Sequence, residues 1–450
     1  MTAKTSDRTS LERFLGIFTE VRAGEGTTSL LLGLNVFLIL MAYYVLKPVR
    51  EALILGEGSA ELKTYMSAAQ VVLLAFVVPY YSRLVARFVR IKLMNVVNIF
   101  FIACLALFYA LALFQVPLAI VFFLWIGIFN LMIIAQFWSF ANDVYTKEEG
   151  ERLFVIVGFG ASLGAVFGAR AADRLIEPLG VYQLLLVGAG ILVIQLLITN
   201  QVDRREASRH AMLPAATAAA PVQKASGTNA FAMVFRTRYL LLMALMLMLL
   251  NWVNTTGEYI LGHILKETAE TMVATGRANG LTEGELIADF YSKYFTMVNV
   301  LGLLLQLFVV SRIVKKLGVP WAVMILPFIS LSAYNILAFF PALYAVLVAK
   351  VAENATDYSL NNTVRNMLFL PCTYEQKFSA KQAIDSFFVR MGDVLSAALV
   401  FVGTAIVSLQ PRGFAAVNAV IVVAWLVLAW RVGREYKRLT VAGEAPAMRV

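Results

Sequence analysis

Long apolar segments alternate with short polar connections along the whole 450-residue chain. A helix needs about 20 predominantly apolar residues to cross the roughly 30 Å hydrocarbon core of a bilayer. Segments that meet this requirement predict twelve membrane-spanning helices, at approximately residues 27–46, 65–86, 91–114, 117–141, 153–172, 180–199, 239–262, 290–311, 320–340, 343–369, 384–408 and 413–432. The pattern therefore predicts an all-α integral membrane protein, with little chain left for a soluble domain.

A polar interruption divides the predicted helices six and six. Residues 200–236 are rich in Ala, Pro, Ser and Thr, which is typical of a flexible linker. Two six-helix bundles joined by a long loop indicate a major-facilitator-like fold, which binds its substrate near the membrane midplane. We expect a cytoplasmic N-terminal segment, an N-terminal bundle, a cytoplasmic linker, a C-terminal bundle and a cytoplasmic tail, at residues 1–26, 27–199, 200–236, 237–432 and 433–450.

Composition and charge strengthen the membrane assignment and add an orientation. The chain is 60% hydrophobic and 15% charged, whereas soluble domains carry about 25% charged residues. Most of the 38 Lys and Arg residues lie in the N-terminal segment, in the C-terminal tail and in the loops after even-numbered spans. Cytoplasmic loops carry such an excess, so we expect both termini in the cytoplasm and no nucleic-acid partner. No transit segment precedes the first span, so a bacterial inner membrane is the expected location.

The tenth predicted span carries a polar stripe that is the main clue to function. Six polar or charged side chains follow the i, i+3, i+4, i+7 rhythm of one helix face, at Lys350, Glu353, Asn354, Asp357, Asn361 and Arg365. An ionisable group inside a bilayer costs about 2.5–3.5 kcal/mol on insertion scales. A row of such groups should therefore face a partner or a water-filled cavity, and a transport pathway is the leading explanation.

Three further clusters place charge at membrane depth. They lie at the end of span one, in span seven and at the start of span eleven, with the residues Lys47, Arg50 and Glu51; Glu258; and Asp385, Arg390 and Asp393. Pro48 in the first cluster is expected to kink or end its helix. Arg390 and Asp393, three residues apart, are expected to pair, which lowers the cost of burying both.

The basic members of these clusters suit an anionic substrate. Guanidinium groups grip phosphate or carboxylate through two hydrogen bonds and do not lose their charge. The basic set is Lys47, Arg50, Lys350, Arg365 and Arg390, and the acidic set is Glu51, Glu258, Glu353, Asp357, Asp385 and Asp393. Because the acidic groups nearly balance the basic ones, some carboxylates are expected to pair with cations, gate the pathway or carry protons.

Small residues recur every four positions in the fifth predicted span, at Gly160, Gly164 and Gly168. This spacing lets two membrane helices approach closely. No strand precedes the glycines and no GK[ST] ending follows them, so they do not indicate a nucleotide-binding loop. We therefore expect helix packing here, and no pump driven by ATP hydrolysis.

The remaining candidate chemistry is sparse. The two cysteines and two histidines, Cys104, Cys372, His210 and His263, are isolated from one another in sequence, so they indicate neither a metal site nor a redox pair. We expect no cofactor, no metal, no catalytic residue and no enzymatic activity. The one long outer loop, at residues 266–289, is expected to be a plain connector rather than a lid.

Five segments resemble the bacterial and plastid ATP/ADP translocase family, also called nucleotide transporters. They are YYVLKPVRE at 43–51, FWSFAND at 137–143, GERLF at 150–154, YSLNNTVRNM at 358–367 and KFSAKQAIDSFFVRMG at 377–392. Their order and spacing match along nearly the whole chain. The resemblance implies a major-facilitator-like fold of twelve helices and exchange of nucleotides such as ATP and ADP across a membrane without hydrolysis.

The resemblance also implies roles for single residues. The family's charged cluster that closes span one falls on Lys47, Arg50 and Glu51, its basic residue in span ten falls on Arg365, and its span-eleven pair falls on Asp385 and Arg390. Three positions depart from the family pattern. Ile126 and Asn254 stand where the exchangers have glutamates, and Asp393 stands where they have a lysine. A reversed charge beside a polyphosphate in a poorly solvated site costs far more than the ~1 kcal/mol of bulk water.

The sequence thus predicts a secondary transporter that works by alternating access between two bundles. Its expected partners are the lipid bilayer and a small anionic substrate, a nucleotide or another phosphorylated metabolite. The predicted substrate-binding residues are Lys47, Arg50, Asn254, Arg365 and Arg390. The altered charges favour a cargo less charged than ATP. A proton-coupled transporter of another solute, and a membrane scaffold or receptor that does not transport, stay open as alternatives.

Overall fold

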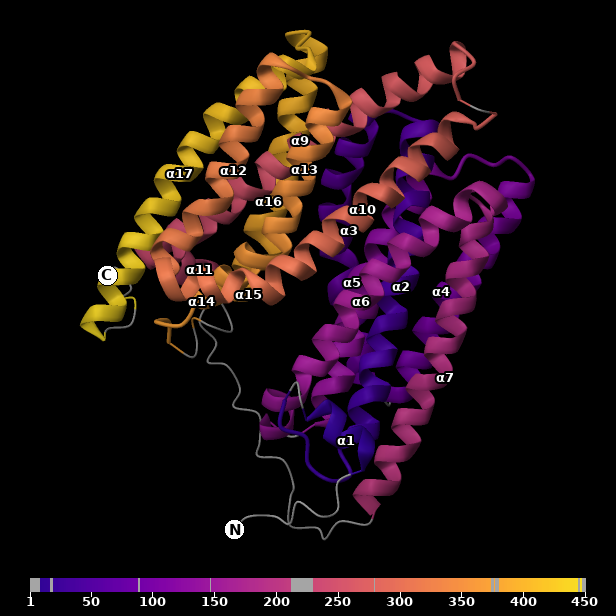
Figure 1. The fold of residues 1–450 in the computed structure, drawn as a ribbon, viewed down its shortest axis with the longest axis vertical. Coiled ribbons are helices and arrows are strands. Elements are labelled where there is room, and N and C mark those ends of the chain that lie inside the picture. The colour runs from indigo at the N-terminus through magenta and orange to yellow at the C-terminus, as the bar shows by residue number, and fades with distance from the viewer. Residues whose placement is uncertain are drawn as a thin grey trace. The chain divides into compact units, whose positions relative to one another are not determined.

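Helices are the regular structure of the computed structural model, and the described residues contain no strand (Figure 1). The structure describes residues 9–16, 19–87, 90–145, 147–211, 230–278, 280–373, 376, 380–443 and 446. The chain divides into two compact units. Unit 1 comprises Met1–Leu53, Leu74–Pro221 and Gly284–Thr296, and unit 2 comprises Ile54–Leu73, Val222–Glu283 and Met297–Val450.

The helices of the first half of the chain are long. Their bounds are α1 Ser10–Leu15, α2 Gly26–Gly56, α3 Ala60–Arg87, α4 Arg90–Leu113, α5 Ala119–Val144, α6 Lys147–Leu179 and α7 Gln183–Ala211. Most of them belong to unit 1, where α4 packs against α5 and α7, and α6 packs against α7. The first turns of α3 belong to unit 2, so unit 2 has a helical segment that lies far from the rest of it in sequence.

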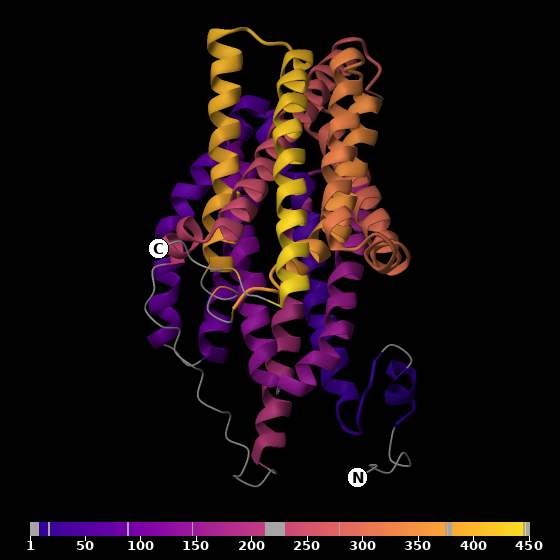
Figure 2. The ribbon, with the colours of Figure 1, turned by 90° about the vertical axis from the view of Figure 1, so that its left-hand side faces the viewer.

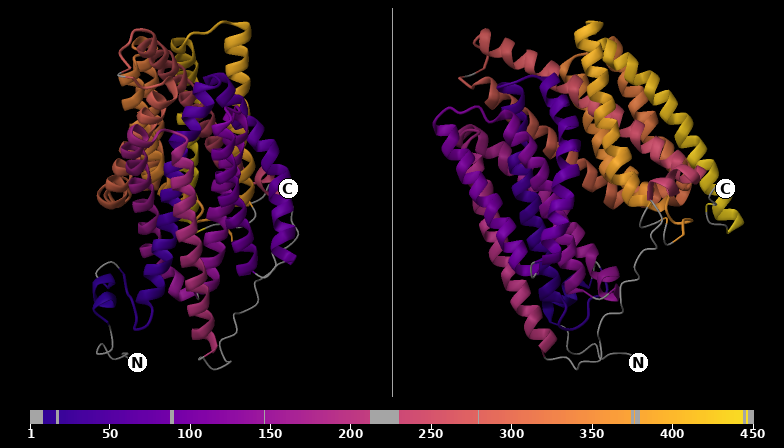
Figure 3. Two further views of the ribbon diagram at one scale, coloured as in Figure 1. Left: turned by 90° about the vertical axis from the view of Figure 1, so that its right-hand side faces the viewer. Right: turned by 180° about the vertical axis from the view of Figure 1, so that it is seen from behind.

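Unit 2 is built around α9. Helices of the second half have the bounds α8 Ala230–Arg236, α9 Arg238–Ala274, α10 Glu283–Phe308, α11 Val310–Leu317, α12 Val319–Phe339, α13 Leu343–Thr356, η2 Asp357–Asn361, α14 Asn362–Met367, α15 Lys381–Ala383, η4 Ile384–Phe388, α16 Val389–Phe401, η5 Val402–Ile406 and α17 Pro411–Ala442, where η marks a π-helical turn. Helix α9 packs against α13, α16 and α17, and α12 packs against α17. Figures 2 and 3 show α17, in yellow, running beside these helices to the C terminus.

All twelve predicted spans fall on helices, but the count of twelve membrane crossings is not confirmed. Nine of the described helices are long and apolar enough to cross a membrane. A tenth is formed by α10 and α11 if the 48° bend between them lies within one span. The other two predicted spans correspond to α3 and to the interrupted run of α13, η2 and α14.

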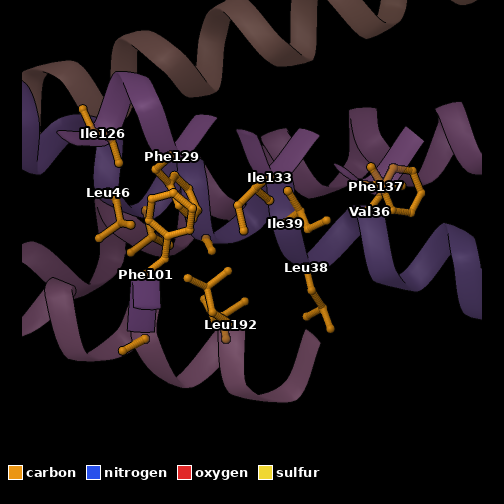
Figure 4. Close-up of a cluster of buried hydrophobic side chains, with 14 of the residues drawn as sticks. Val36, Leu38, Ile39, Leu46, Phe101, Ile126, Phe129, Ile133, Phe137 and Leu192 are labelled. Carbon is orange, nitrogen blue, oxygen red and sulfur yellow. The ribbon is translucent and has the colours of Figure 1, made fainter. Parts of the chain in front are cut away.

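Aromatic side chains fill the core of unit 1. The indole of Trp125 on α5 lies between Phe122 and Phe129, with ring centroids 5.6 and 5.4 Å away. Phe101 on α4 meets both Trp125 and Phe129 edge-on. Figure 4 shows the neighbouring aliphatic side chains of α2, α5 and α7 pointing into the same cluster. Offset and edge-on rings add to the stabilisation that comes from burying apolar area alone, so this cluster fixes how these helices pack.

The glycine stripe packs against another helix, as predicted. A Cβ atom added to Gly160, Gly164 or Gly168 of α6 would overlap the main chain of α2. The three α2 carbonyl groups in contact belong to Gly33, Phe37 and Met41, which also recur every four residues. The two backbones therefore lie directly against each other over two helical turns, an approach that only glycine permits.

Two predicted helix ends are wrong. Pro48 lies inside α2, which continues to Gly56. Proline has a helical φ angle and loses one backbone hydrogen bond, a loss that membrane helices tolerate when neighbouring groups compensate. The predicted outer loop at residues 266–289 is largely helical, because α9 extends to Ala274 and α10 begins at Glu283. Its Lys, Glu and Ala residues are good helix formers, so polarity did not end the helix.

The close approach of α6 and α2 predicts that Gly164→Ala destabilises the protein. Its methyl group overlaps the Phe37 carbonyl, so the helices must separate, at a cost of roughly 1–3 kcal/mol. The thermal unfolding of detergent-purified protein measures this change. Gly158→Ala in the same helix is the matched control, because a Cβ at Gly158 meets nothing within 4 Å. Equal melting temperatures for the two variants would contradict the packing.

Candidate functional site

A buried lysine lies at the centre of the candidate site. Lys350 on α13 is only 1% exposed. Its ammonium group donates to Glu353 Oε2 at 2.7 Å and to Asn254 Oδ1 at 2.7 Å. The main-chain oxygen of Asn254 lies 3.3 Å from the same nitrogen, and Glu258 Oε1 lies 3.7 Å from it. Oxygen atoms of α9 and α13 therefore take the place of water around this charge.

The carboxylate of Glu353 is equally enclosed. Ser330 Oγ donates to Glu353 Oε1 at 2.6 Å, and the hydroxyl of Tyr334 lies 3.2 Å from Glu353 Oε2. Both partners come from α12, one helical turn apart. Gly257 on α9 leaves the space for this arrangement, because an added Cβ would overlap the Tyr334 hydroxyl and lie 3.1 Å from Lys350 Nζ.

A second ion pair extends the cluster toward α3. Glu258 Oε2 lies 3.5 Å from Nζ of Lys63, which is buried in the first turn of α3. Asn354 Nδ2 donates to the other oxygen of Glu258 at 3.2 Å. Two lysines and two glutamates thus alternate through the interior of unit 2, and their formal charges cancel. We call Lys63, Glu258, Lys350 and Glu353 the charge cluster.

The lower half of the polar stripe behaves differently from the charge cluster. The π-turn η2 interrupts the helix at Asp357–Asn361, so the residues beyond it do not continue the same face. The predicted single regular face is therefore wrong. Within the turn, Asn361 Nδ2 donates to Asp357 Oδ1 at 2.6 Å. Arg365 follows on α14, and its Nε is buried without a hydrogen-bond partner among the described residues.

Asp393 on α16 is anchored to α9. Its Oδ1 accepts hydrogen bonds from Asn251 Nδ2 at 2.8 Å and from Thr255 Oγ1 at 2.7 Å. Its Oδ2 lies 3.3 Å from a terminal nitrogen of Arg390, so the predicted pair is confirmed. The Arg390 side chain is still 43% exposed. Asp393 therefore holds one edge of a guanidinium group whose other donors reach outward.

Two predicted groups need separate description. Asp385 lies in the π-turn η4, and its Oδ1 is buried without a hydrogen-bond partner among the described residues. Asn254, predicted to bind substrate, uses its side-chain oxygen to hold Lys350. The sequence placed Glu258 near the outer end of a span. It lies instead well inside α9, because that helix runs on to Ala274.

The charged cluster near the end of α2 belongs to unit 1. Arg50 donates to the carboxylate of Glu51 from Nε at 3.0 Å, and its NH2 group also pairs with that carboxylate. Its guanidinium carbon lies 5.0 Å from the ring centre of Phe123. Lys47 Nζ lies 3.9 Å from the ring centre of Phe295, an attractive cation–π distance. Aromatic faces therefore help both cations to remain charged where water is scarce.

Sequence reasoning missed three members of the site. Lys63, Ser330 and Tyr334 all contact the charge cluster, yet none was predicted. Ser330 and Tyr334 carried a weak signal, because they lie one turn apart in an otherwise apolar span. Lys63 carried none, because it precedes its predicted span and reads as a loop residue. Among the described residues, no group of His, Cys, Asp and Glu is arranged to hold a metal ion.

Comparison with known families agrees with this architecture. The family model of the TLC ATP/ADP transporters matches residues 112–436, which is more than half of the chain. The chain belongs to the TLC ATP/ADP transporter family. The match contains helices α5 to α16 and most of α17, and therefore most of the candidate site, including Asn254, Glu258, Lys350, Arg365 and Asp393.

Two curated relatives are similar at low identity. The ADP,ATP carrier protein 1 of Chlamydia pneumoniae is 23% identical over 347 residues, which are 68% of this chain and 64% of the relative. The ADP,ATP carrier protein 2 of Chlamydia trachomatis serovar D is 23% identical over 367 residues, which are 70% of this chain and 64% of the relative. The chain thus spans somewhat less than two thirds of the curated relatives that it matches.

A solved structure supports the fold class. The nucleoside transporter NupG is similar with a TM-score of 0.60 and 12% identity, covering 92% of this chain and 99% of that one. At this identity the likeness concerns the fold alone. The all-α, major-facilitator-like fold predicted from the sequence is therefore confirmed.

The tight contact at Gly257 predicts that Gly257→Ala destabilises unit 2. The methyl group pushes the Tyr334 hydroxyl away from Glu353, and we expect a loss of roughly 1–3 kcal/mol in the unfolding free energy. Denaturant unfolding of the purified protein measures it. Gly302→Ala is the control, because a Cβ there lies at an ordinary 3.6 Å from the nearest atom.

A second substitution makes this test specific to the contact. Tyr334→Phe removes the hydroxyl that the new methyl group meets. The double variant Gly257→Ala/Tyr334→Phe should therefore be more stable than the sum of the two single effects predicts. Strictly additive effects would show that the methyl group and the hydroxyl do not collide.

Proposed function

We propose that the protein is a secondary transporter that exchanges a nucleotide, or a related phosphorylated anion, across a membrane by alternating access. The observation that carries this proposal is the family match over residues 112–436. The relatives are named as ADP,ATP carriers, so a nucleotide is the class of cargo to consider first. The match favours exchange over proton-coupled transport of another solute and over a membrane scaffold.

Arg365 and Arg390 are the proposed anion ligands in unit 2. Each offers guanidinium donors that the described protein groups leave available: the buried Nε of Arg365 and the outward edge of Arg390. Guanidinium groups bind phosphate through two parallel hydrogen bonds and keep their charge when desolvated. Lys47 and Arg50 of unit 1 are proposed as a further basic cluster for the same cargo, with Glu51 tuning the charge of Arg50.

The charge cluster is proposed to support the site rather than to bind the cargo. Lys350 is enclosed by oxygen atoms of the protein, and Glu353 accepts from three groups. A cargo phosphate that reached Lys350 would have to displace a buried carboxylate, which leaves that charge unpaired. Asn254 acts in the same way, as a ligand of Lys350.

The charge around Arg390 supports a cargo with fewer charges than ATP. Asp393 is buried and stands where the resembling exchangers have a lysine. Its carboxylate neutralises part of Arg390, so the positive charge presented to an anion is smaller. We propose that nucleotides with fewer phosphates, or other phosphorylated metabolites, are preferred. Asp357, Asp385 and Glu258 are proposed as gating or ion-pairing groups of the same pathway.

The proposed location is a bacterial inner membrane with both termini in the cytoplasm. Its support is the excess of Lys and Arg in the N-terminal segment, the C-terminal tail and the loops after even-numbered spans. This orientation would place the C-terminal end of α17, with its four basic residues between Arg431 and Arg438, on the cytoplasmic side.

Exchange in proteoliposomes tests the proposal. Vesicles loaded with unlabelled ATP, ADP, AMP or buffer receive labelled nucleotide outside, and trans-stimulated uptake is measured. We expect uptake that requires an internal nucleotide and prefers the less charged ones. Arg365→Ala should lower it roughly ten- to hundredfold, because one charge-assisted contact contributes about 1.5–3 kcal/mol.

The matched control is Arg412→Ala, which removes an exposed arginine at the start of α17. It should leave uptake unchanged. The absence of uptake of every nucleotide and phosphate ester tried would overturn the proposed cargo class. Equal uptake by wild type and Arg365→Ala would overturn the proposed role of Arg365.

A further inference from the structure

One face of α17 changes from apolar to basic along its length. Exposed apolar side chains recur along it at Val420, Val423, Val427 and Trp430, with Val420 72% and Trp430 49% exposed. These positions lie within an arc of roughly 100° on the helix. The same arc continues into Arg431, Arg434 and Arg438, which are all exposed. The apolar part has the character of a surface that faces lipid acyl chains, and the basic part begins where that surface ends.

A pocket lies at this transition. It has a volume of about 900 Å³ and lies between the start of α9 and the end of α17 in unit 2. Four arginines line it: Arg238 of α9 and Arg431, Arg434 and Arg438 of α17. The acidic residue of the lining, Glu435, pairs with Arg438 at 2.6 Å. The formal charge of these five residues is therefore three positive.

The pocket is organised as well as charged. The Arg434 guanidinium lies 5.4 Å from the ring centre of Trp430, which also lines the pocket. This stacking limits the conformations of a long side chain and keeps its donors along one plane. Arg238 is the first residue of α9, and the N-cap residue Thr237 makes no side-chain capping bond in the described structure. The positive end of the helix dipole thus adds to the arginines.

We propose that this pocket binds the phosphate headgroup of an acidic phospholipid. Basic pockets between membrane helices suit such headgroups, and arginine matches the planar geometry of phosphate oxygens. The continuous apolar stripe favours a lipid over a soluble phosphate, because acyl chains can follow Val427, Val423 and Val420 along α17. Trp430 lies between the two bands, as aromatic residues do at membrane interfaces.

Native mass spectrometry of the full-length, detergent-purified protein tests the site. Cardiolipin, phosphatidylglycerol and phosphatidylcholine are titrated separately, and the bound lipid is counted. We expect the two acidic lipids to bind and phosphatidylcholine to bind much more weakly. Arg238→Gln/Arg434→Gln, which removes one arginine from each helix, should weaken cardiolipin binding roughly thirtyfold. Trp430→Ala should weaken it less.

The control has the same change in net charge. Arg277→Gln/Arg412→Gln removes two exposed arginines of unit 2 that do not line the pocket and should leave cardiolipin binding unchanged. An equal loss in both double variants would show non-specific attraction and would overturn the proposal. Displacement of cardiolipin by excess inorganic phosphate or ATP would assign the pocket to a soluble anion instead, which also overturns it. Preference for acidic lipids that only the pocket variants lose would establish the site.

Discussion

The cost of removing a charge from water is the constraint on which unit 2 depends. Lys350 and Glu353 are both almost completely buried, and they lie 2.7 Å apart. An unpaired buried charge costs several kcal/mol, so each of the two requires the other and further hydrogen bonds as well. Helices α3, α9 and α12 must therefore supply Lys63, Asn254, Glu258, Ser330 and Tyr334 at fixed places, which ties the packing of these helices to a polar interior.

This arrangement divides the tasks of the charged residues in the tenth predicted span. The part before the π-turn η2 is satisfied within the protein, and the part after it leaves the Nε of Arg365 buried without a hydrogen bond in the described structure. Interruptions of this kind are frequent at functional sites, because they turn side chains away from the regular face. In the proposed transporter, the charge cluster gives rigidity and Arg365 gives affinity for the anion.

Much of the fold followed from patterns that are local in sequence. Apolar runs predicted the helices, and the spacing of Gly160, Gly164 and Gly168 predicted the contact that these glycines make with α2. The pairing of Arg390 with Asp393 was also predictable, because residues three apart on a helix are neighbours. These predictions succeeded since each depends only on helical geometry and on the cost of burial.

The remaining features depend on tertiary contacts that a sequence pattern does not contain. Lys63 meets Glu258 across nearly two hundred residues, and no local signal marks them as partners. The π-turn η2 changes which stripe residues share a face, although their spacing fits an α-helix. The extension of α9 to Ala274 moved Glu258 from a helix end to the interior, because good helix formers outweighed polarity.

A double-mutant cycle between Lys350 and Glu353 tests the central claim most directly. The unfolding free energies of wild type, Lys350→Met, Glu353→Gln and the double variant are compared. Because each single substitution strands a buried charge or loses its bonds, we predict losses of about 3–5 kcal/mol for Lys350→Met and a double variant clearly more stable than the sum of the single losses. Additive losses would contradict a mutually dependent buried pair.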